Sequence, residues 1–412
     1  MGQGARLIDQ QAGYHEPAVV IGAGLNGLGV ARSLMRARVP VWIVDSDSRQ
    51  PGMHTRAARP WVIAAMQGEA LVEGLRSLVP SRLSNSRPVL ILTQEESVKA
   101  VSRYREVLSP HYRFTLPEKG MVDTLLHKEG FQRLAEALRA PIPPLVHIRS
   151  IQDLPQLKSL RFPVVVKPGE RHAGYSHAFK KAYRIGDREE AEQLINRILL
   201  VMPDVVVQEW IEGADSDIFF CLQYIRHDGI VAASFTGRKI RSWPPQVGGT
   251  ASCTAAPEFA GKLEQMTTRF FNSAGVVGLA GMEYKRDAGS GAFRMVEPTI
   301  GRTDYQEEVA TLNGINLPYA TYCAELDMPV MQPVLTKRLL VWRDRSADSQ
   351  SAAAQNQSIR QSFPDGCVVV EASWRWNDPM PSLMHMLERV RGALQVRVRK
   401  VLGSSKNAKG EP

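Results

Sequence analysis

Residues 281–299 read GMEYKRDAGSGAFRMVEPT, two strand-like segments around the turn AGSG. This pattern predicts a β-hairpin. With the turn centred on residues 289–290, Glu283 and Glu297 fall at, or within one residue of, directly paired positions, with Cβ atoms roughly 5 Å apart on one face. Two carboxylates this close repel each other unless something positive lies between them, and a Mg²⁺ ion that also binds phosphate oxygens meets this need. Thr299 faces the same way and offers a neutral oxygen.

A second interpretation of the hairpin is a solvated acidic face on which Lys285 neutralises part of the charge. The segments that precede the hairpin favour the first interpretation. FPVVVKP places Lys167 at the end of an apolar strand, where a partly buried ammonium group can hold an anion. The loop GERHAGYSHAFKK follows it, and its glycine and lysine residues suit a loop that closes over phosphates.

Further along the chain, the apolar strand VVVQEWIEG ends in the polar residues Gln208 and Glu209. Such a strand end can bind adenine, because a carboxylate accepts from the amino group while Trp210 and Ile211 cover the base. Asp215 lies six residues past Glu209, within reach of ribose hydroxyls. Each motif alone also fits a core strand with a polar end, so the order of the motifs along the chain carries the prediction.

The N-terminal stretch VVIGAGLNGLGVARSL, residues 19–34, predicts a buried strand, a G-x-G-x-x-G turn and a helix. Gly22 permits the tight turn, Gly24 lets the backbone approach a phosphate, and Gly27 lets the helix pack on its strand. Asp45 ends the next strand, 18 residues beyond Gly27, near the usual place of a ribose-binding acid. The pattern leaves open an FAD- or NAD-dependent oxidoreductase, or a Rossmann-like sheet whose crevice holds a substrate.

Taken in order, these motifs resemble the ATP-grasp superfamily, and within it the predicted carboxylate–amine ligases (ATP-dependent carboligases). The resemblance covers roughly residues 17–330 and adds a phosphate-contacting lysine, Lys128, in LLHKEGF. It implies an α/β and α+β fold, with a Rossmann-like pre-ATP-grasp domain followed by a two-subdomain ATP-grasp fold. One departure stands in the last metal motif. The family has Glu-x-Asn-Pro-Arg, whereas this chain has EPTIGR, with Thr299 in place of Asn and Arg302 one position later.

The resemblance implies an ATP- and Mg²⁺-dependent, ADP-forming ligase that activates a carboxylate as an acylphosphate for attack by an amine or similar nucleophile, with Mn²⁺ as a possible substitute. The implied ATP-binding residues are Lys128, Lys167, Gln208, Glu209, Trp210, Ile211 and Asp215. The implied metal ligands are Glu283, Glu297 and Thr299, and the implied catalytic residues are Arg302 and Lys167. The expected acceptor-substrate crevice contains Gly22, Gly24, Asn26, Gly27 and Asp45. Two alternatives remain: the oxidoreductase, and a non-catalytic ATP-binding protein suggested by Thr299.

The pattern of the whole chain predicts its domain organisation. The expected divisions are a disordered N-terminus over 1–16, a Rossmann-like domain over 17–115, an ATP-grasp domain over 116–330 and a C-terminal extension over 331–412. In that extension, the Ser-, Gln- and Ala-rich segment 345–362 is expected to be a loop. Apolar residues at three- and four-residue spacing over 382–402 predict a basic amphipathic helix.

Composition limits the class of protein. The 412 residues are 44% hydrophobic and 23% charged, which is typical of a soluble globular protein. No apolar run approaches the roughly 18 residues of a membrane span. The four cysteines form no C-x-x-C pair, so a reducing cytoplasm is expected. The net charge of +9 comes partly from the C-terminal segment, which either packs on the body or contacts an anionic membrane or a partner. We expect small-molecule substrates and no nucleic acid, with a homodimer as one possible assembly.

Overall fold

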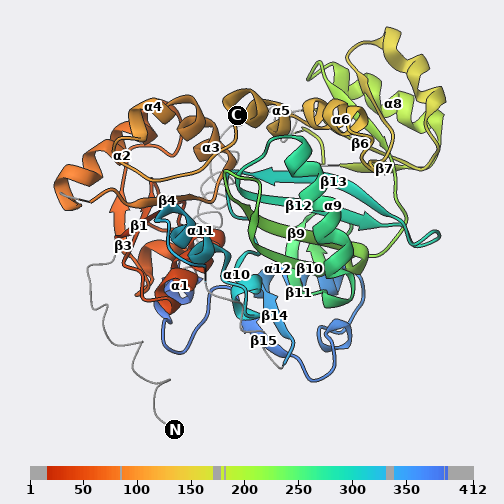
Figure 1. Ribbon diagram of the computed structural model, residues 1–412. Helices are drawn as coiled ribbons and strands as arrows, with labels where there is room; N and C mark the ends of the chain where they lie inside the picture. The colour runs from red at the N-terminus through yellow and green to blue at the C-terminus, as the bar shows by residue number, and fades with distance from the viewer. Residues whose placement is uncertain are drawn as a thin grey trace, which may run out of the picture.

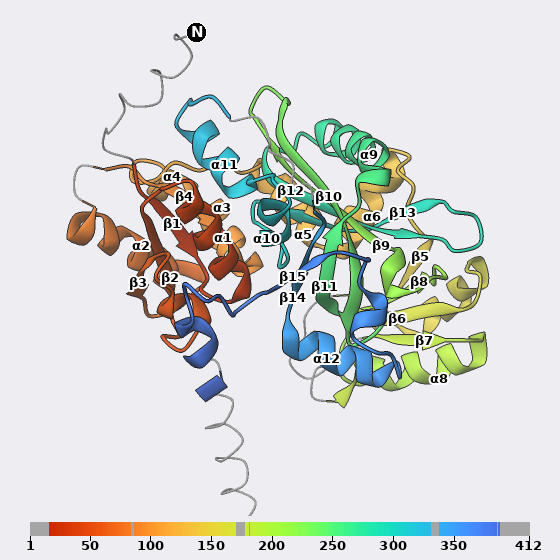
Figure 2. The same ribbon diagram turned by 90° about the horizontal axis from the view of Figure 1, so that it is seen from below.

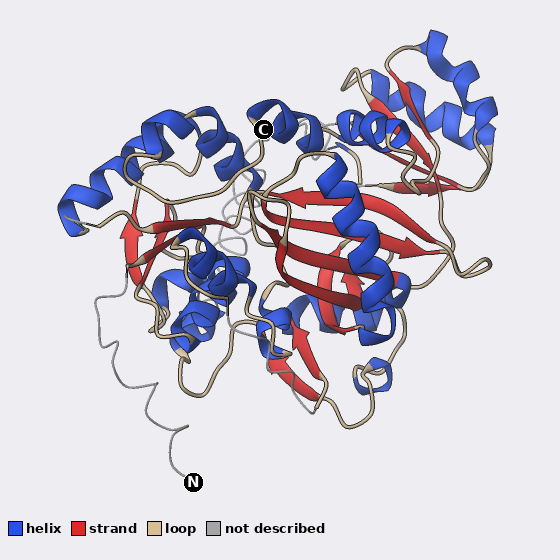
Figure 3. Ribbon diagram, in the orientation of Figure 1, coloured by secondary structure: helices blue, strands red, loops and turns tan. Residues whose placement is uncertain are grey.

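The computed structural model describes residues 16–83, 86–169, 178–180, 182–330, 338–384 and 386–387. Within these residues the chain forms three β-sheets. Figure 1 shows the N-terminal sheet on one side, the large sheet in the centre and the small β5–β8 sheet at the far end, and Figure 3 shows helices packed around all three. The predicted disordered terminus, except for Glu16, and most of the predicted helix over 382–402 lie outside the described residues.

The N-terminal sheet is parallel, with strand order β3-β2-β1-β4. Its strands are β1 (Ala18–Ile21), β2 (Val41–Asp45), β3 (Arg59–Val62) and β4 (Val89–Leu92). The helices of this unit are α1 (Leu25–Arg36), α2 (Gly68–Arg82), α3 (Glu95–Arg103) and α4 (Arg105–Leu108). Every residue of β1, β2 and β4 is buried, as expected for apolar strands of a parallel sheet covered on both faces. The order 3-2-1-4 is that of the first four strands of a Rossmann fold, which confirms that this unit is Rossmann-like.

A small antiparallel sheet follows, with order β5-β8-β6-β7. Two helices, α5 (Lys119–Leu126) and α6 (Lys128–Ala137), lead into it. Its elements are β5 (Leu145–Ile148), β6 (Val164–Pro168), β7 (Tyr183–Ile185), α8 (Arg188–Leu199) and β8 (Val205–Glu209). One face packs on α8 through a cluster that includes Val164, Val166 and Ile195. Because side chains alternate along a strand, Lys167 lies on the other face.

The central sheet has the order β13-β12-β9-β10-β11-β14-β15 and is antiparallel except for the pair β14–β15. Its strands are β9 (Ile218–Ile225), β10 (Val231–Trp243), β11 (Gly249–Ala255), β12 (Gly278–Arg286), β13 (Phe293–Ile300), β14 (Leu340–Arg343) and β15 (Val368–Glu371). Its helices are α9 (Ala260–Ser273), α10 (Glu308–Leu312), α11 (Leu317–Glu325) and α12 (Arg345–Ala354). Short 3₁₀ turns are η1 (Pro51–His54), η2 (Ile151–Ser159), η3 (Asp215–Asp217), η4 (Pro257–Phe259) and η5 (Arg360–Ser362).

Two strands from beyond residue 330 belong to this central sheet. β14 pairs with β11, and β15 pairs with β14; Figure 2 shows both strands, in blue, continuing the sheet. The predicted boundary at 330 is therefore wrong, because the region after it completes the sheet instead of forming a separate extension. Among the described helices, none is long and apolar enough to cross a membrane.

The segment expected to be a loop over 345–362 begins with helix α12, so that expectation is also wrong. Asp344 caps the helix and accepts hydrogen bonds from the backbone N–H groups of Ser346 and Ala347. The alanines of this segment favour a helix. The fully buried carboxylate of Asp348 fixes the helix to the sheet, with Oδ1 2.8 Å from Arg241 Nε. Capping and a long-range ion pair outweigh the polar composition that suggested a loop.

Candidate active site

The acids of the hairpin face each other across β12 and β13. Glu283 is directly opposite Glu297, and Gly281 is directly opposite Thr299. Both pairs lie on the same face, because they are two residues apart along strands of continuous register. Glu297 is exposed and Glu283 is partly buried. The direct pairing predicted from the sequence is confirmed, and it leaves one carboxylate accessible to a ligand.

A buried lysine supplies the positive charge beside these acids. Lys239, on β10, places Nζ 2.7 Å from Glu283 Oε2, and its side chain is only 4% exposed. Burial alone would lower the pKa of Lys239, but the Glu283 carboxylate, with Asp304 and Glu297 farther off, raises it above its ordinary value. Lys239 is therefore a cation. Sequence reasoning missed it; the available signal was a lysine in the middle of a long strand.

Lys285 interacts with the hairpin acid Glu283 only through its charge, because its hydrogen bonds go to backbone carbonyl groups. Its Nζ donates hydrogen bonds to the carbonyl oxygens of Gly213, at 2.9 Å, and Ala214, at 2.6 Å. Burial lowers its pKa, and the carboxylates of Asp217 and Asp215 act in the opposite direction. Lys285 thus fixes the loop that precedes η3.

A cavity of about 60 Å³ lies between the small sheet, strand β13 of the hairpin and the helices α5 and α6. Its wall includes five residues predicted for the site, which come from four separate stretches of sequence: Lys128, Lys167, Gln208, Glu297 and Arg302. Lys167 Nζ donates to Gln208 Oε1 at 2.8 Å, and Lys128 Nζ donates to the carbonyl oxygen of Pro168 at 3.0 Å. Two cations from the small-sheet side therefore oppose an acid and an arginine from the hairpin side.

Arg302 has hydrogen-bonding capacity left for a ligand. Its Nη1 donates to the carbonyl oxygen of Thr303 at 3.1 Å and lies 4.0 Å from Asp304 Oδ1. Its Nε is buried and, within the described part of the chain, has no hydrogen-bond partner. A guanidinium group with donors to spare suits a planar carboxylate.

The predicted adenine hinge is oriented differently from the expectation. In the register of β6 and β8, Glu209 is opposite Val164, on the face that packs against α8, and Gln208 is opposite Val165, on the cavity face. The Glu209 carboxylate instead accepts a hydrogen bond from the backbone N–H of Arg161 at 2.9 Å. The expectation that this carboxylate accepts from adenine is therefore wrong, and Gln208 is the hinge side chain that lines the cavity.

The other hinge residues lie beyond the cavity wall. The Trp210 ring is 5.6 Å from the guanidinium carbon of Arg184. Asp215 is buried, and its carboxylate accepts backbone hydrogen bonds from Ser242, at 2.9 Å, and Gln246, at 2.7 Å. These bonds hold the end of β10. Ile211, at the end of this segment, is partly buried, and the roles of Trp210, Ile211 and Asp215 toward ATP stay predictions.

The glycine-rich turn has the predicted mechanical role. Gly22 has φ +99°, and a Cβ atom there would lie 2.3 Å from Thr93 Oγ1. A Cβ atom at Gly27 would lie 1.7 Å from the carbonyl oxygen of Gly22, whereas Gly24 has no such contact within 3.8 Å. Asp45 Oδ2 accepts the backbone N–H of Ala23 at 2.7 Å. The carboxylate of Asp45 thus closes the turn on itself, which corrects its predicted role in holding a substrate.

Asn26 links this turn to the segment that follows the hairpin. Its Nδ2 donates to the carbonyl oxygens of Thr93 and Thr303, both at 3.1 Å, and its Oδ1 accepts from Thr303 Oγ1 at 2.8 Å. The Thr303 N–H donates to the carbonyl oxygen of Leu92, at the carboxyl end of β4. Thr303 is therefore bonded both to Asn26 and to the carboxyl end of β4, where a substrate was expected. Asn26 is corrected from a substrate contact to a tether for the residue beside Arg302.

Replacing Asn26 by alanine is expected to destabilise the protein by about 1–3 kcal/mol, because buried partners of the amide lose their hydrogen bonds. Urea unfolding followed by circular dichroism measures this change. The matched control is Asn272→Ala, whose amide donates one hydrogen bond at the surface, to Gly229; its effect is expected to stay within about 0.5 kcal/mol. Equal effects of the two substitutions would contradict the tether.

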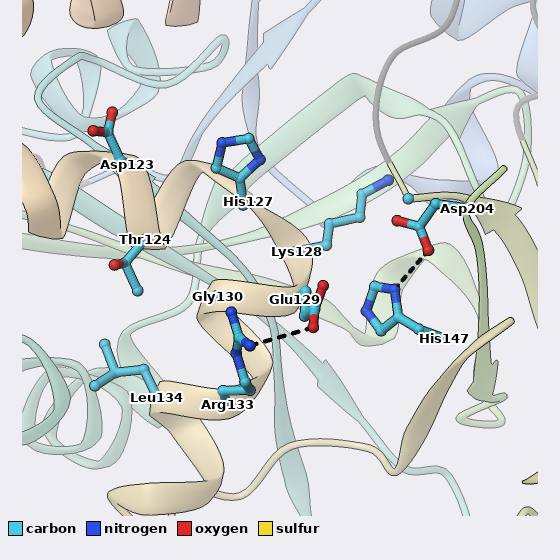
Figure 4. Close-up of a pocket in the computed structure, with 11 residues that line it drawn as sticks. Asp123, Thr124, His127, Lys128, Glu129, Gly130, Arg133, Leu134, His147 and Asp204 are labelled. Atoms are coloured by element: carbon cyan, nitrogen blue, oxygen red, sulfur yellow. Dashed lines mark hydrogen bonds and ion pairs between the residues drawn. The ribbon is translucent and has the colours of Figure 1, made fainter. Parts of the chain in front are cut away.

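A larger open cleft of about 700 Å³ continues the cavity past Lys128, which lines both. Figure 4 shows the His147 ring directed at Asp204, with Nδ1 2.9 Å from Oδ1. The hydrogen bond from His147 lowers the pKa of Asp204 against the effect of burial. His147 and Lys167 are both paired with Val206, so they share one face of the small sheet. The cleft therefore extends along the cavity face, and Lys128 supplies a cation to it.

Most of the loop predicted to cover phosphates lies outside the described residues, which break off after Gly169. Gly169 lines the open cleft together with the first residues of α6. The predicted role of this loop stays a prediction.

The chain resembles known proteins in its structure but not in its sequence. No protein-family model matches the sequence, and a search of curated proteins finds no match. N5-carboxyaminoimidazole ribonucleotide synthetase in its ADP complex matches with a TM-score of 0.62 at 12% identity, over 83% of this chain and 85% of that chain. The enzyme from Aspergillus clavatus with ADP and 5-aminoimidazole ribonucleotide gives 0.58 at 14% identity, over 79% and 80%.

A second kind of enzyme has the same fold. The biotin carboxylase domain of 2-oxoglutarate carboxylase from Hydrogenobacter thermophilus, a dimer solved with MgADP, ADP and bicarbonate, matches with a TM-score of 0.61 at 11% identity, over 79% of this chain and 74% of that chain. These identities establish the fold alone. The chain therefore shares the fold of these ADP-containing enzymes, and its N-terminal sheet is Rossmann-like.

Proposed function

We propose that the protein is an ATP- and Mg²⁺-dependent ligase that activates a substrate carboxylate as an acylphosphate for attack by an amine or similar nucleophile. One observation carries the proposal: Lys128, Lys167, Glu297 and Arg302 line a single cavity between the small sheet and the hairpin. Cations on one wall suit phosphates, and an arginine on the other suits a carboxylate. Structural neighbours that contain ADP, MgADP or bicarbonate support the same reading.

The donor set fits a magnesium ion that arrives with the nucleotide. Among the described residues, no group of three or more His, Cys, Asp or Glu side chains could hold a metal ion by itself. Mg²⁺ is usually bound by one or two carboxylates together with substrate phosphates, so two paired acids suffice. Glu297 would be the accessible ligand, Glu283 the second, and Lys239 would orient Glu283 through their 2.7 Å contact. When bound, Mg²⁺ neutralises charge on the phosphate oxygens.

The residues of the chain then act mainly by position and charge. Lys128 and Lys167 would donate to the phosphates, and Arg302 would bind the substrate carboxylate. An oxygen of that carboxylate attacks the γ-phosphorus, and the bond from phosphorus to the ADP oxygen breaks, which gives an acylphosphate and ADP. The amine nitrogen attacks the acyl carbon, the bond to the phosphate oxygen breaks, and the nitrogen loses a proton.

The decisive experiment measures ATP-dependent phosphate release with pooled carboxylic acids and amines. Release that needs Mg²⁺ and both substrate pools is expected. Nucleotide binding without release over the whole panel would favour the non-catalytic alternative. Bound flavin or NAD(P)H turnover would favour an oxidoreductase, which the buried position of Asp45, 4% exposed, argues against.

Thr299 gives a test of the metal assignment. A hydroxyl group is a weaker Mg²⁺ ligand than an amide carbonyl, so Thr299→Asn is expected to lower the Mg²⁺ concentration at half-maximal phosphate release by about tenfold. Thr299→Ser keeps the hydroxyl and serves as the control. An unchanged Mg²⁺ dependence in a folded Thr299→Asn protein would remove this residue from the metal site.

Location and assembly follow as weaker parts of the proposal. The four cysteines are unpaired, which agrees with a reducing cytoplasm. The homodimer, and the contact of the basic C-terminal segment with a membrane or partner, remain predictions. Size-exclusion chromatography with light scattering measures the first, and vesicle co-sedimentation of the full chain measures the second.

A further inference from the structure

A cluster of exposed apolar side chains lies near the end of the described chain. This C-terminal apolar cluster consists of Trp376, Met380, Leu383, Met386 and Leu387, which are between 39% and 90% exposed. All five fall within twelve residues of sequence, whereas the other large apolar side chains exposed in the described part of the chain occur singly or in pairs. Single exposed apolar residues are ordinary, but a cluster of them indicates a contact surface.

The chain at the start of this cluster is fixed to the body of the protein. Figure 2 shows the segment, in dark blue, leading from β15 to the N-terminal unit. Asp378 is 3% exposed and accepts a hydrogen bond from Arg32 of α1 at 2.9 Å. Arg375 donates to Glu308 of α10 at 2.7 Å. Trp376 lies between these two anchored residues, so its exposed ring is held at the surface by the packing on either side.

The cluster continues onto a helix whose apolar side is exposed. The described chain is helical over 380–384 and 386–387. Met380, Leu383 and Leu387 are spaced by three and four residues and therefore share one side of the helix. Each of them is at least 39% exposed. The sequence left open whether the C-terminal segment packs on the body, and in this first part of it the exposed side chains argue against such packing.

The charges around the cluster suit an anionic surface. The only acid in residues 372–387 is Asp378, which is buried. Arg56 is exposed beside the cluster, and its Nη1 donates to the carbonyl oxygen of Asn377 at 2.9 Å. The sequence that follows, 388–412, contains seven arginine and lysine residues and two acids. An apolar face accompanied by basic residues is typical of segments that lie on anionic lipid headgroups.

A lipid bilayer fits these features better than a second protein does. Trp376 is 90% exposed, and tryptophan is enriched at the headgroup level of membranes, where its ring is partly in apolar and partly in polar surroundings. A protein partner would have to supply a matching apolar pocket together with an acidic surface. An anionic bilayer offers an apolar interior and negative headgroups at once.

We propose that the C-terminal apolar cluster docks this protein on the surface of an anionic lipid bilayer. Trp376 lies among the headgroups in this arrangement, and Met380, Leu383 and Leu387 enter the edge of the acyl region. The basic residues that follow in the sequence supply the attraction to the negative headgroups. The inference goes beyond the proposed ligase function and does not depend on it, because docking requires neither ATP nor a substrate.

The experiment measures co-sedimentation of the full chain with phosphatidylcholine vesicles, prepared with and without about 30% phosphatidylglycerol. The wild-type protein is expected to bind the anionic vesicles more strongly than the neutral ones, and to bind less as salt screens the charges. The double variant Trp376→Ser, Leu383→Ser is expected to bind at least about tenfold more weakly, because two apolar side chains no longer leave water. Both residues are exposed, so an unchanged circular dichroism spectrum is expected.

Leu200→Ser is the matched control, because Leu200 is 86% exposed but lies at the end of α8, outside the cluster. Its replacement should leave vesicle binding unchanged. A wild-type protein that does not bind anionic vesicles, or a double variant that binds them as well as the wild type, would overturn the inference. A dimer that only the wild type forms, without vesicle binding, would also overturn it and identify the cluster as a protein contact.

Tryptophan fluorescence gives a second measurement that needs only a conservative change. Anionic vesicles are expected to shift the emission of the wild-type protein to shorter wavelength, because an indole ring leaves water. Trp376→Phe keeps an apolar ring, so this variant should still sediment with the vesicles but lose most of the shift. A full shift in the Trp376→Phe protein would contradict the placement of Trp376 in the bilayer surface.

Discussion

Replacing Lys167 by methionine is expected to lower ATP-dependent phosphate release by about 10²- to 10³-fold. Lys167 extends from the cavity face of β6, with Nζ 2.8 Å from Gln208 Oε1, and in the proposed site its ammonium group compensates phosphate charge together with Lys128. Methionine keeps much of the length and the apolar stem but removes the charge. Steady-state phosphate release at saturating substrate measures the effect.

Lys158→Met is the control for this prediction. Lys158 lies on η2 in the same small unit, is exposed and is not in the cavity wall. Its replacement is expected to leave the rate unchanged. A folded Lys167→Met protein with the wild-type rate would refute the phosphate site, whereas a fall in rate with unchanged thermal stability would support it.

The hairpin shows what the sequence could predict. The pairing of Glu283 with Glu297 depends only on a turn and on two adjacent strands, so the register follows from local spacing. Lys239 could not be predicted in the same way. It comes from β10, which β9 separates from the hairpin, and its contact with Glu283 depends on the order of strands in the sheet.

The wrong prediction for the Glu209 carboxylate, at the end of β8, has a physical cause. Polar residues at the end of an apolar strand predict a site, but a shift of one residue moves a side chain to the opposite face. The cavity therefore receives Gln208, and Glu209 lies on the α8 face. Asn26 was assigned to a substrate because its true partner, Thr303, lies 277 residues away in the sequence. The local pattern around Asn26 gives no sign of such a distant contact.

Asp348→Ala is expected to destabilise the protein by about 3–5 kcal/mol, because it leaves buried cations without their counter-charge. Asp348 is fully buried and lies 2.8 Å from Arg241 Nε and 2.7 Å from Arg343 Nε, and it accepts a hydrogen bond from Ser252 Oγ. Arg241 is 1% exposed, and its Nη1 has no partner within the described residues even when Asp348 is present. Urea unfolding measures the loss of stability, and the dependence of the unfolding free energy on urea concentration is expected to stay unchanged.

Two further variants separate this charge effect from the stability of the helix. Asp344→Ala removes only the cap of α12 and is expected to cost about 1 kcal/mol. Arg241→Met in the Asp348→Ala background replaces the stranded cation by an apolar group, and replacing a buried ion pair by apolar residues is often neutral. Part of the lost stability should therefore return in the double variant. A double variant less stable than Asp348→Ala alone would show that the cost lies in helix packing and not in the uncompensated charge.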